Sequence, residues 1–149
     1  MNMNTIRLTK EFRFEGAHAL RGYKGKCRHI HGHSYRLRVT VSGIPSHSPF
    51  DPNNGMVIDF SALKELVINL IIEPFDHALL LRKDAPLTDS IKEAYQNVLV
   101  LPFQPTCENL CFHFASLLAP AIPSPATLFS IRLYETSNSF AEWFATDNS

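Results

Sequence analysis

The chain has 149 residues, of which 45% are apolar and 19% are charged, and this predicts one domain, 1–149, with a buried core. Fourteen basic and fourteen acidic side chains cancel, so no net field favours nucleic acid or an anionic membrane as a partner. The start, Met1 to Lys10, lacks the apolar core of a signal peptide, and no apolar run approaches the ~20 residues of a membrane span, so we expect a cytoplasmic protein.

Two strands with period-two alternation are predicted in the first third of the chain. In the first, Ile6 to His18, the even positions are mostly apolar, and Lys10 is the one mismatch. The second, His31 to Val41, has the cleanest alternation in the protein, with Arg and Ser or Thr on its other face. Residues 43–55 are rich in Pro, Ser, Asn and Gly and predict a loop.

Two amphipathic helices are predicted next. The first begins with Asp59 as its N-cap, runs to about Glu73 and ends because of Pro74. The second begins with Thr106 as its N-cap and runs to Leu118, with a glutamate in its first turn, where the helix dipole favours a carboxylate.

The remaining segments complete the predicted fold. Residues Arg82 to Asn97 are amphipathic and do not distinguish a helix from a strand. Two short strands close the chain, Thr127 to Thr136 and about Phe140 to Thr146. The chain order ββααββ predicts an α+β fold in which two helices cover one face of an antiparallel four-stranded sheet.

Three histidines are expected to converge at one end of this sheet. In an antiparallel hairpin, His18 at the end of the first strand lies beside His31 at the start of the second. His31 and His33 point to the same face with Cα atoms roughly 6.5–7 Å apart, so both rings can reach one ion. Three nitrogen ligands and an open fourth position suit a catalytic zinc ion, and a polar strand edge without metal is the alternative. Three further histidines are expected on loop or helix surfaces: His29, His47 and His113.

The three cysteines are an odd number without framework spacing, which favours reduced thiols. Cys27 shares a loop with two lysines and an arginine, and this positive charge with a nearby zinc ion would favour the thiolate, which can accept a proton. A small residue in a turn is the alternative for Cys27. Cys107 and Cys111, four apart on a helix, are expected to be buried as apolar side chains.

Asp76 and His77 follow the end of a helix in an otherwise apolar segment. A carboxylate that fixes the tautomer of a histidine is the usual arrangement for moving a proton at neutral pH. Because adjacent residues seldom bond each other directly, we expect these two side chains to have different partners. A purely structural role is the alternative.

Glu135 is expected on the apolar face of its strand, together with Phe129, Ile131 and Leu133. A carboxylate there is costly unless a cationic or donor-rich ligand meets it. The edge of a 2-amino-pyrimidinone ring offers two parallel N–H donors of suitable geometry. A glutamate that turns to solvent at the strand end is the alternative.

Six short motifs carry a family resemblance. They are FEGAH (14–18), KCRHIHGHSY (26–35), GMVIDF (55–60), FDHAL (75–79), PTCENL (105–110) and YET (134–136). In this order, from about Phe12 to Thr136, they resemble the 6-pyruvoyltetrahydropterin synthase and 6-carboxytetrahydropterin synthase family. The Cys-x-x-x-His-Gly-His block is the most specific of them.

The resemblance implies the tunnelling fold (T-fold), in which subunits join their sheets into a barrel, usually a trimer stacked into a hexamer, with active sites at subunit interfaces. Within the family, bacterial 6-carboxytetrahydropterin synthases feed the queuosine pathway, and pyruvoyl synthases feed tetrahydrobiopterin. The implied site has Zn²⁺ on His18, His31 and His33, Cys27 as proton acceptor, His77 with Asp76 as relay, Glu135 as anchor of the pterin ring, and Thr106 and Glu108 shaping the pocket.

We therefore expect a zinc-dependent 6-carboxytetrahydropterin synthase that converts 7,8-dihydroneopterin triphosphate and releases acetaldehyde and triphosphate. The alternatives are a pyruvoyl synthase, a non-catalytic zinc- or pterin-binding module, and a zinc hydratase or hydrolase that would not need Cys27. A folate-pathway branch of the family carries Glu in place of Cys27, which disfavours it. Two segments stay open: Arg82 to Leu101 is longer than in compact bacterial members, and the loop Arg21 to Lys26 either meets the triphosphate or is simply solvated.

Overall fold

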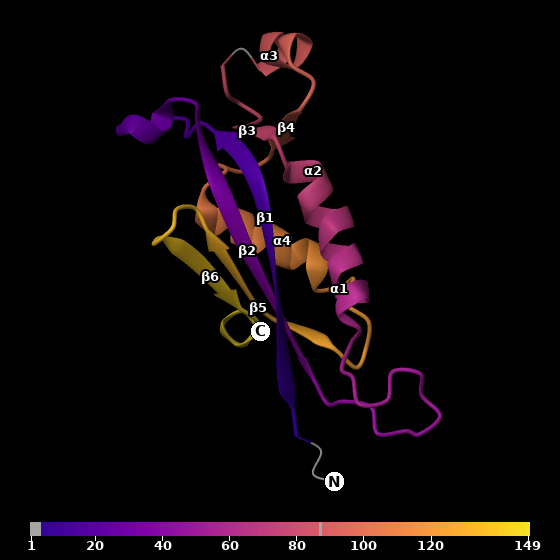
Figure 1. The fold of residues 1–149 in the computed structure, drawn as a ribbon. Coiled ribbons are helices and arrows are strands. Elements are labelled where there is room, and N and C mark those ends of the chain that lie inside the picture. Colours follow the sequence, from indigo (N-terminus) through magenta and orange to yellow (C-terminus); the bar gives the residue numbers. More distant parts are fainter. Residues whose placement is uncertain (1–3, 87) are drawn as a thin grey trace.

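The computed structural model describes residues 4–86 and 88–149, so the first three residues of the predicted start lie outside the described part (Figure 1). Its centre is a six-stranded sheet in the order β4-β3-β1-β2-β5-β6. The strands are β1 (Ile6–His18), β2 (His31–Gly43), β3 (Ala78–Arg82), β4 (Val98–Leu101), β5 (Thr127–Tyr134) and β6 (Phe140–Phe144). The helical segments are η1 (Lys26–Arg28), α1 (Phe60–Val67), η2 (Ile68–Ile72), α2 (Glu73–Phe75), α3 (Thr88–Ala94), α4 (Cys107–Leu118) and η3 (Ala145–Asp147).

Strands β1 and β2 form the long antiparallel hairpin that the alternation predicts. Its register runs from the pair Ile6 and Gly43 to the pair His18 and His31. Even positions of β1 and odd positions of β2 face the helices, and Phe14 and Tyr35 are stacked and almost fully buried there. The hairpin is therefore the framework that presents the histidines.

The prediction of four antiparallel strands is wrong, because the sheet has six strands and is mixed. β3 pairs parallel with β1, from Gly16 beside Ala78 to His18 beside Leu80, and β4 pairs parallel with β3. The sequence of β3, Ala-Leu-Leu-Leu-Arg, is a continuous apolar run, and Leu80 and Leu81 are both buried. A parallel strand that is buried on both faces lacks the period-two pattern by which strands are recognised.

Helices α1 and α4 cover one face of the sheet, as predicted, and α3 stands beyond its end beside β3 and β4 (Figure 1). The carboxylate of Asp59 accepts a hydrogen bond from the backbone N–H of Ser61 at 2.6 Å, which confirms it as the N-cap of α1. The first helix does not end at Pro74, because α1, η2 and α2 run continuously to Phe75. Pro74 follows directly after the π-helical segment η2, at whose end the backbone N–H of Glu73 donates to the carbonyl of Ile68, five residues back.

Strand β5 contains a bulge opposite β2, and its first residues therefore do not face the side of the sheet that the sequence alternation predicts. The register of β5 against β2 shifts between Thr40 and Val41, which leaves Phe129 as the extra residue. Such an insertion reverses the facing of the residues before it. Leu128 is consequently buried, whereas Phe129 packs under the guanidinium of Arg7, 3.8 Å from the ring centroid, on the uncovered face.

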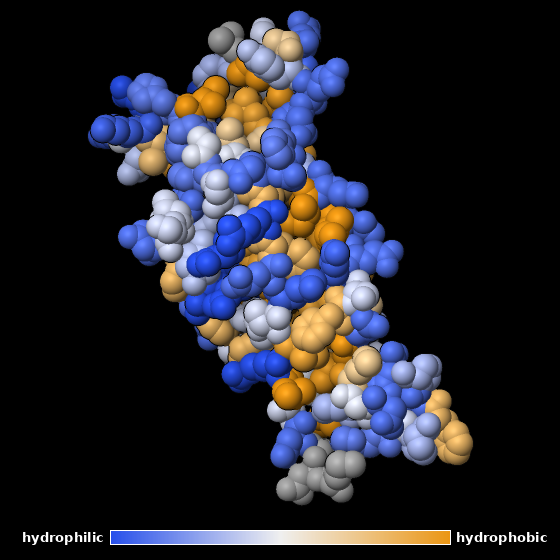
Figure 2. All heavy atoms as spheres, viewed as in Figure 1, coloured by the Kyte–Doolittle hydropathy of each residue, from blue (hydrophilic) through white to orange (hydrophobic). Residues whose placement is uncertain are grey.

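The core lies between the helices and the covered face of the sheet, and Cys107 and Cys111 are buried in it as expected. Hydrophilic side chains cross the middle of the opposite face, which Figure 2 shows with β1 and β2 in front. Across residues 4–86 and 88–149, none of the helices has the length and apolar character that a membrane crossing requires.

Candidate metal centre

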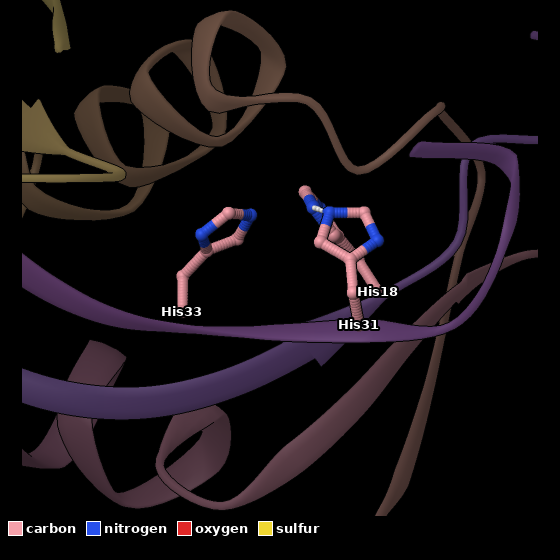
Figure 3. A group of neighbouring side chains, drawn as sticks. All are labelled: His18, His31 and His33. Carbon is pink, nitrogen blue, oxygen red and sulfur yellow. Dashed lines mark hydrogen bonds between the residues drawn. The ribbon is translucent and has the colours of Figure 1, made fainter. Parts of the chain in front are cut away.

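Three histidines converge at the end of the β1–β2 hairpin (Figure 3). His18 and His31 are register partners, and His33 is the partner of Gly16. One ring nitrogen from each histidine lies within 4.8 Å of the other two, and the Nε2 atoms of His18 and His31 are 3.0 Å apart. The convergence predicted from strand parity is confirmed.

Backbone carbonyls fix the orientation of two of these rings. Nδ1 of His18 lies 2.6 Å from the carbonyl oxygen of Pro105, and Nδ1 of His31 lies 2.7 Å from the carbonyl oxygen of His29. A carbonyl can only accept, so this hydrogen-bond network assigns the proton of each ring to Nδ1. In the neutral rings, the two Nε2 atoms then face each other with lone pairs at 3.0 Å, which a shared cation would stabilise.

His33 brings a third ring nitrogen with no hydrogen bond of its own. Its Nε2 is buried and, within the described part of the chain, has no hydrogen-bond partner. The Oε1 atom of Glu135 lies 3.5 Å from this nitrogen and 3.6 Å from Nε2 of His18. A buried nitrogen without a partner, beside two others, fits the donor set of a bound cation.

Burial favours the neutral form of these histidines. Removal from water lowers the pKa of His18, which is 1% exposed, and outweighs the opposite effects of the Pro105 carbonyl and the Glu135 carboxylate. Burial also lowers the pKa of His33. The lowered pKa values of His18 and His33 favour unprotonated imidazole nitrogens, the ligand type that suits zinc, and the three residues fit a zinc ion.

Glu135 follows directly after β5, and its side chain does not turn away to solvent. The carboxylate points to the rings of His18 and His33 and is 30% exposed. Its backbone N–H donates to the carbonyl of Ser139 at 3.0 Å, which fixes the turn between β5 and β6. The structure thus places an acceptor for ligand N–H groups next to the three histidines.

Asp76 and His77 do contact each other, and the expectation of different partners is wrong. Nδ1 of His77 lies 2.9 Å from Oδ1 of Asp76. His77 has a φ of 59°, a left-handed conformation that a non-glycine residue seldom adopts, and the sequence gives no sign of it. The backbone N–H of Glu15 donates to the same oxygen at 2.9 Å and is the main cause of the lowered pKa of Asp76.

In the described residues, His77 and Cys27 are not bonded to the three histidines. The His77 side chain is 74% exposed and lines a hollow of about 750 Å³ together with Glu15, His33 and Ser34. Glu15 and Ser34 are register partners whose side chains point to the uncovered face of the hairpin. Cys27 lies half-buried in η1. In the ranges 4–86 and 88–149, no hydrogen bond or ion pair joins His77 or Cys27 to the histidine group.

Thr106 and Glu108 begin helix α4 beside the site. The hydroxyl of Thr106 accepts from the backbone N–H of Asn109 at 3.2 Å, which confirms it as the N-cap. The carbonyl that orients His18 belongs to Pro105, the residue before this cap. Glu108 is exposed in the first turn.

The sequence does not reveal the two backbone acceptors of the site. The carbonyls of Pro105 and His29 set the tautomers of His18 and His31, but a backbone carbonyl cannot be recognised from the type of side chain. The side chain of His29 is exposed, as expected, and its backbone carbonyl accepts the hydrogen bond from the His31 ring. Only the folded loop geometry identifies these groups.

Known proteins are similar to this chain over most of its length. A family model described as 6-pyruvoyl tetrahydropterin synthase matches residues 7–145. The 6-carboxy-5,6,7,8-tetrahydropterin synthase of Haemophilus influenzae is 34% identical over 142 residues, which cover 93% of this chain and 98% of that protein. The protein of the same name from Synechocystis sp. is 35% identical over 137 residues, which cover 91% of each chain.

Solved structures with the same fold are more distant in sequence. An uncharacterized protein from Wolinella succinogenes aligns with a TM-score of 0.77 at 22% identity, covering 95% of this chain and 99% of that one. The 6-pyruvoyl tetrahydropterin synthase of Caenorhabditis elegans aligns with a TM-score of 0.69 at 22% identity, covering 97% and 99%. These structures establish the shared fold, and the family model spans nearly the whole sequence. The chain therefore belongs to the 6-pyruvoyl tetrahydropterin synthase family.

Proposed function

We propose that the chain is a zinc-dependent 6-carboxytetrahydropterin synthase, a lyase of queuosine biosynthesis. It would convert 7,8-dihydroneopterin triphosphate to 6-carboxy-5,6,7,8-tetrahydropterin with loss of acetaldehyde and triphosphate. The observation that carries the proposal is the pair of Nε2 atoms of His18 and His31, which face each other at 3.0 Å beside the unpartnered nitrogen of His33. The names of relatives that are 34% and 35% identical to this chain support the carboxy product.

His18, His31 and His33 would hold the zinc ion. A bound zinc ion polarises substrate hydroxyl oxygens and acidifies the neighbouring C–H bonds. The carbonyls of Pro105 and His29 keep two of the rings in the tautomer that ligation requires. The residues thus provide three ligands and leave room for a substrate oxygen.

Glu135 would anchor the pterin ring. Its carboxylate can accept two parallel N–H bonds from the amino-pyrimidinone edge, and such charge-assisted hydrogen bonds are the stronger kind. Its Oε1 atom lies 3.5–3.6 Å from Nε2 of His33 and His18, so the anchored ring would lie next to the metal ion. Thr106 and Glu108 would shape the same pocket from the start of α4.

Cys27 would accept the proton from carbon, and His77 would relay protons with Asp76 holding its tautomer. The contact of 2.9 Å between Asp76 and His77 supports the second part. The His77 side chain is 74% exposed and, in the described residues, has no hydrogen bond or ion pair to the three histidines, so it would serve the metal centre of another copy of the chain. We accordingly propose a homo-oligomer, a trimer or hexamer, with sites shared between subunits.

The test is incubation of the zinc-loaded protein with 7,8-dihydroneopterin triphosphate and separation of the products by mass spectrometry. Formation of the carboxy product with acetaldehyde supports the proposal. A pyruvoyl product with triphosphate supports the tetrahydrobiopterin branch instead. No consumption of the substrate by the zinc-loaded protein overturns both.

Two variants make this test sharper. Cys27→Ala should still bind zinc and pterin but lose turnover, because only the proton acceptor is removed. If Cys27→Ala stays fully active, the protein acts as a zinc hydratase or hydrolase on a bound water. If the protein binds a pterin but no variant or condition yields a product, it is a binding module.

A further inference from the structure

The loop between His18 and His31 gathers positive charge, and the only role given to it so far is to favour the Cys27 thiolate. Residues 21–29 contain two arginines, two lysines and no carboxylate, although the whole chain is neutral. Figure 2 shows a strongly hydrophilic projection at the upper left, where Figure 1 places the loop between β1 and β2. We call residues 21–29 the basic loop. Its charge makes a local field that attracts anions.

A hollow of about 480 Å³ lies against the basic loop. Arg21, Lys24 and Arg28 line it from the loop. Ala85 and Pro86, from the segment before α3, line it from the other side. The long segment between β3 and α4 thus supplies one wall of a cationic depression, which gives a role to residues whose purpose the sequence leaves open.

The basic loop is held in place before any ligand arrives. The side-chain amide of Gln104 accepts from the backbone N–H of Arg21 at 3.2 Å and donates to its carbonyl at 2.8 Å. The N–H of Leu20 donates to the carbonyl of Cys27 at 2.9 Å across the loop. Preorganisation of this kind reduces the entropy lost on binding.

The charges on this loop are largely uncompensated. Nε of Arg21 lies 3.5 Å from a carboxylate oxygen of Asp84, and Asp84 is itself held by Arg82. In residues 4–86 and 88–149, neither Lys24 nor Arg28 forms an ion pair with a carboxylate. Both cationic groups are exposed and available to an anion.

The basic loop and Glu135 contact different members of the histidine group. Glu135 contacts His33 and His18, whereas the loop joins at His31, whose ring is held by the carbonyl of His29. Figure 3 shows His33 on one side of the group and His31 on the other. A ligand anchored at Glu135 therefore lies beside the same three histidines that the basic loop adjoins through His29.

We propose that the basic loop binds the triphosphate group of the substrate through Arg21, Lys24 and Arg28. The identity of the anion rests on the proposed function, since dihydroneopterin triphosphate carries its pterin and its phosphates at opposite ends of a three-carbon chain. Arginine guanidinium groups bind phosphate oxygens in pairs, and a lysine adds a point charge. The same recognition of a polyphosphate chain applies to inorganic tripolyphosphate, which can therefore serve as a probe.

The test is isothermal titration of inorganic tripolyphosphate into the metal-free protein, in which no zinc ion can hold the anion. The double variant Lys24→Gln/Arg28→Gln should bind it on the order of ten-fold more weakly, because two facing charges are lost. The matched control Lys10→Gln/Lys64→Gln, which removes the same charge from β1 and α1, should bind as the wild type does. Arg28→Lys keeps the charge but loses the paired donors, so its affinity should lie between those of the wild type and Arg28→Gln.

Added salt should weaken this binding, as expected for exposed charges. Wild-type protein that takes up no tripolyphosphate, or a double variant that binds like its control, overturns the proposal. An equal loss in the double variant and in the Lys10→Gln/Lys64→Gln control also overturns it, because net charge rather than the loop would then be responsible.

Kinetics separate this inference from the proposed function. In an active enzyme the double variant should raise KM on the order of ten-fold and change kcat far less, with binding of unphosphorylated 7,8-dihydroneopterin unchanged. If the double variant turns over the substrate with an unaltered KM, the proposal that the basic loop binds triphosphate is overturned, and the proposed synthase activity is retained. If the wild type binds tripolyphosphate through the basic loop but shows no turnover, polyphosphate binding by the loop is supported and the proposed synthase activity is overturned.

Discussion

The three histidines differ in what their replacement would disturb. His18 is buried and hydrogen-bonded to the start of α4, so its loss affects packing as well as ligation. His33 has no hydrogen bond to lose within the described residues. Replacement of His33 should therefore change metal binding without removing a hydrogen bond that supports the fold.

We expect His33→Ala to fold normally and to lose zinc on dialysis. Loss of a supporting partner costs about 10–100-fold in metal affinity, and loss of a ligand should cost at least as much. The measurement is zinc per chain by mass spectrometry, with circular dichroism as the check on folding. His47→Ala, an exposed loop histidine, is the control and should keep its zinc. Full zinc in His33→Ala would show that it is not a ligand.

The lowered pKa of His18 predicts weaker folding in acid for the metal-free protein. The unfolded chain protonates His18 near its ordinary pKa of about 6.5, whereas the folded chain keeps it neutral to a lower pH. The unfolded state then binds more protons, so the free energy of unfolding falls as pH drops below about 6.5 and is retained above that value. Urea unfolding with a chelator at several pH values measures this, and His18→Gln should reduce the slope. Stability that rises toward acid would contradict the burial of a neutral ring.

At the scale of single elements, helix α4 links folding to the site. Its N-cap is Thr106, and the preceding Pro105 orients His18. The start of this helix and the position of one ligand are therefore set by the same turn.

Thr106→Ala should cost about 1 kcal/mol of stability, since an N-cap hydroxyl satisfies one free N–H of the first turn. Chemical unfolding measures the loss. Thr106→Ser keeps the hydroxyl and is expected to fold nearly as well as the wild type. If the alanine and serine variants are equally stable, the cap contributes nothing.

The sequence predicts the elements in which apolar and polar residues alternate in a regular pattern within the element itself. The β1–β2 hairpin alternates along its whole length, and this parity also predicts the three histidines. β3 has no alternation because the run Leu79 to Leu81 is apolar throughout, and β4 is only four residues long. The contact of Asp76 with His77 depends on one left-handed residue, and the bulge at Phe129 depends on pairing with a distant strand, so neither has a local signal.

At the scale of the whole molecule, shared sites make a strong prediction. His33→Ala and His77→Ala should each be inactive alone, because one lacks a metal ligand and the other the proton relay. Co-expressed chains that mix at random would contain intact sites, roughly a quarter of the total, each built from the good half of two subunits. Activity of the mixture measures this, and light scattering gives the subunit number.

The matched control is the double variant His33→Ala/His77→Ala mixed with wild-type chains, in which the two losses lie on one subunit. If the mixture of single variants stays inactive while the oligomer forms, His77 does not act in a neighbouring site. A monomer with full activity would equally contradict sharing.

The register of the hairpin also gives the metal centre an order of assembly. His18 and His31 are only 13 positions apart, so they meet once a short loop closes. The contacts of Glu15 with Asp76 and of His18 with Pro105 span 61 and 87 positions, and long-range contacts of this kind form more slowly. We therefore expect the pair His18 and His31 to form early in folding, before the Pro105 carbonyl that orients His18 is in place. A metal ion captured at that stage would be enclosed by the rest of the chain rather than admitted to a finished pocket.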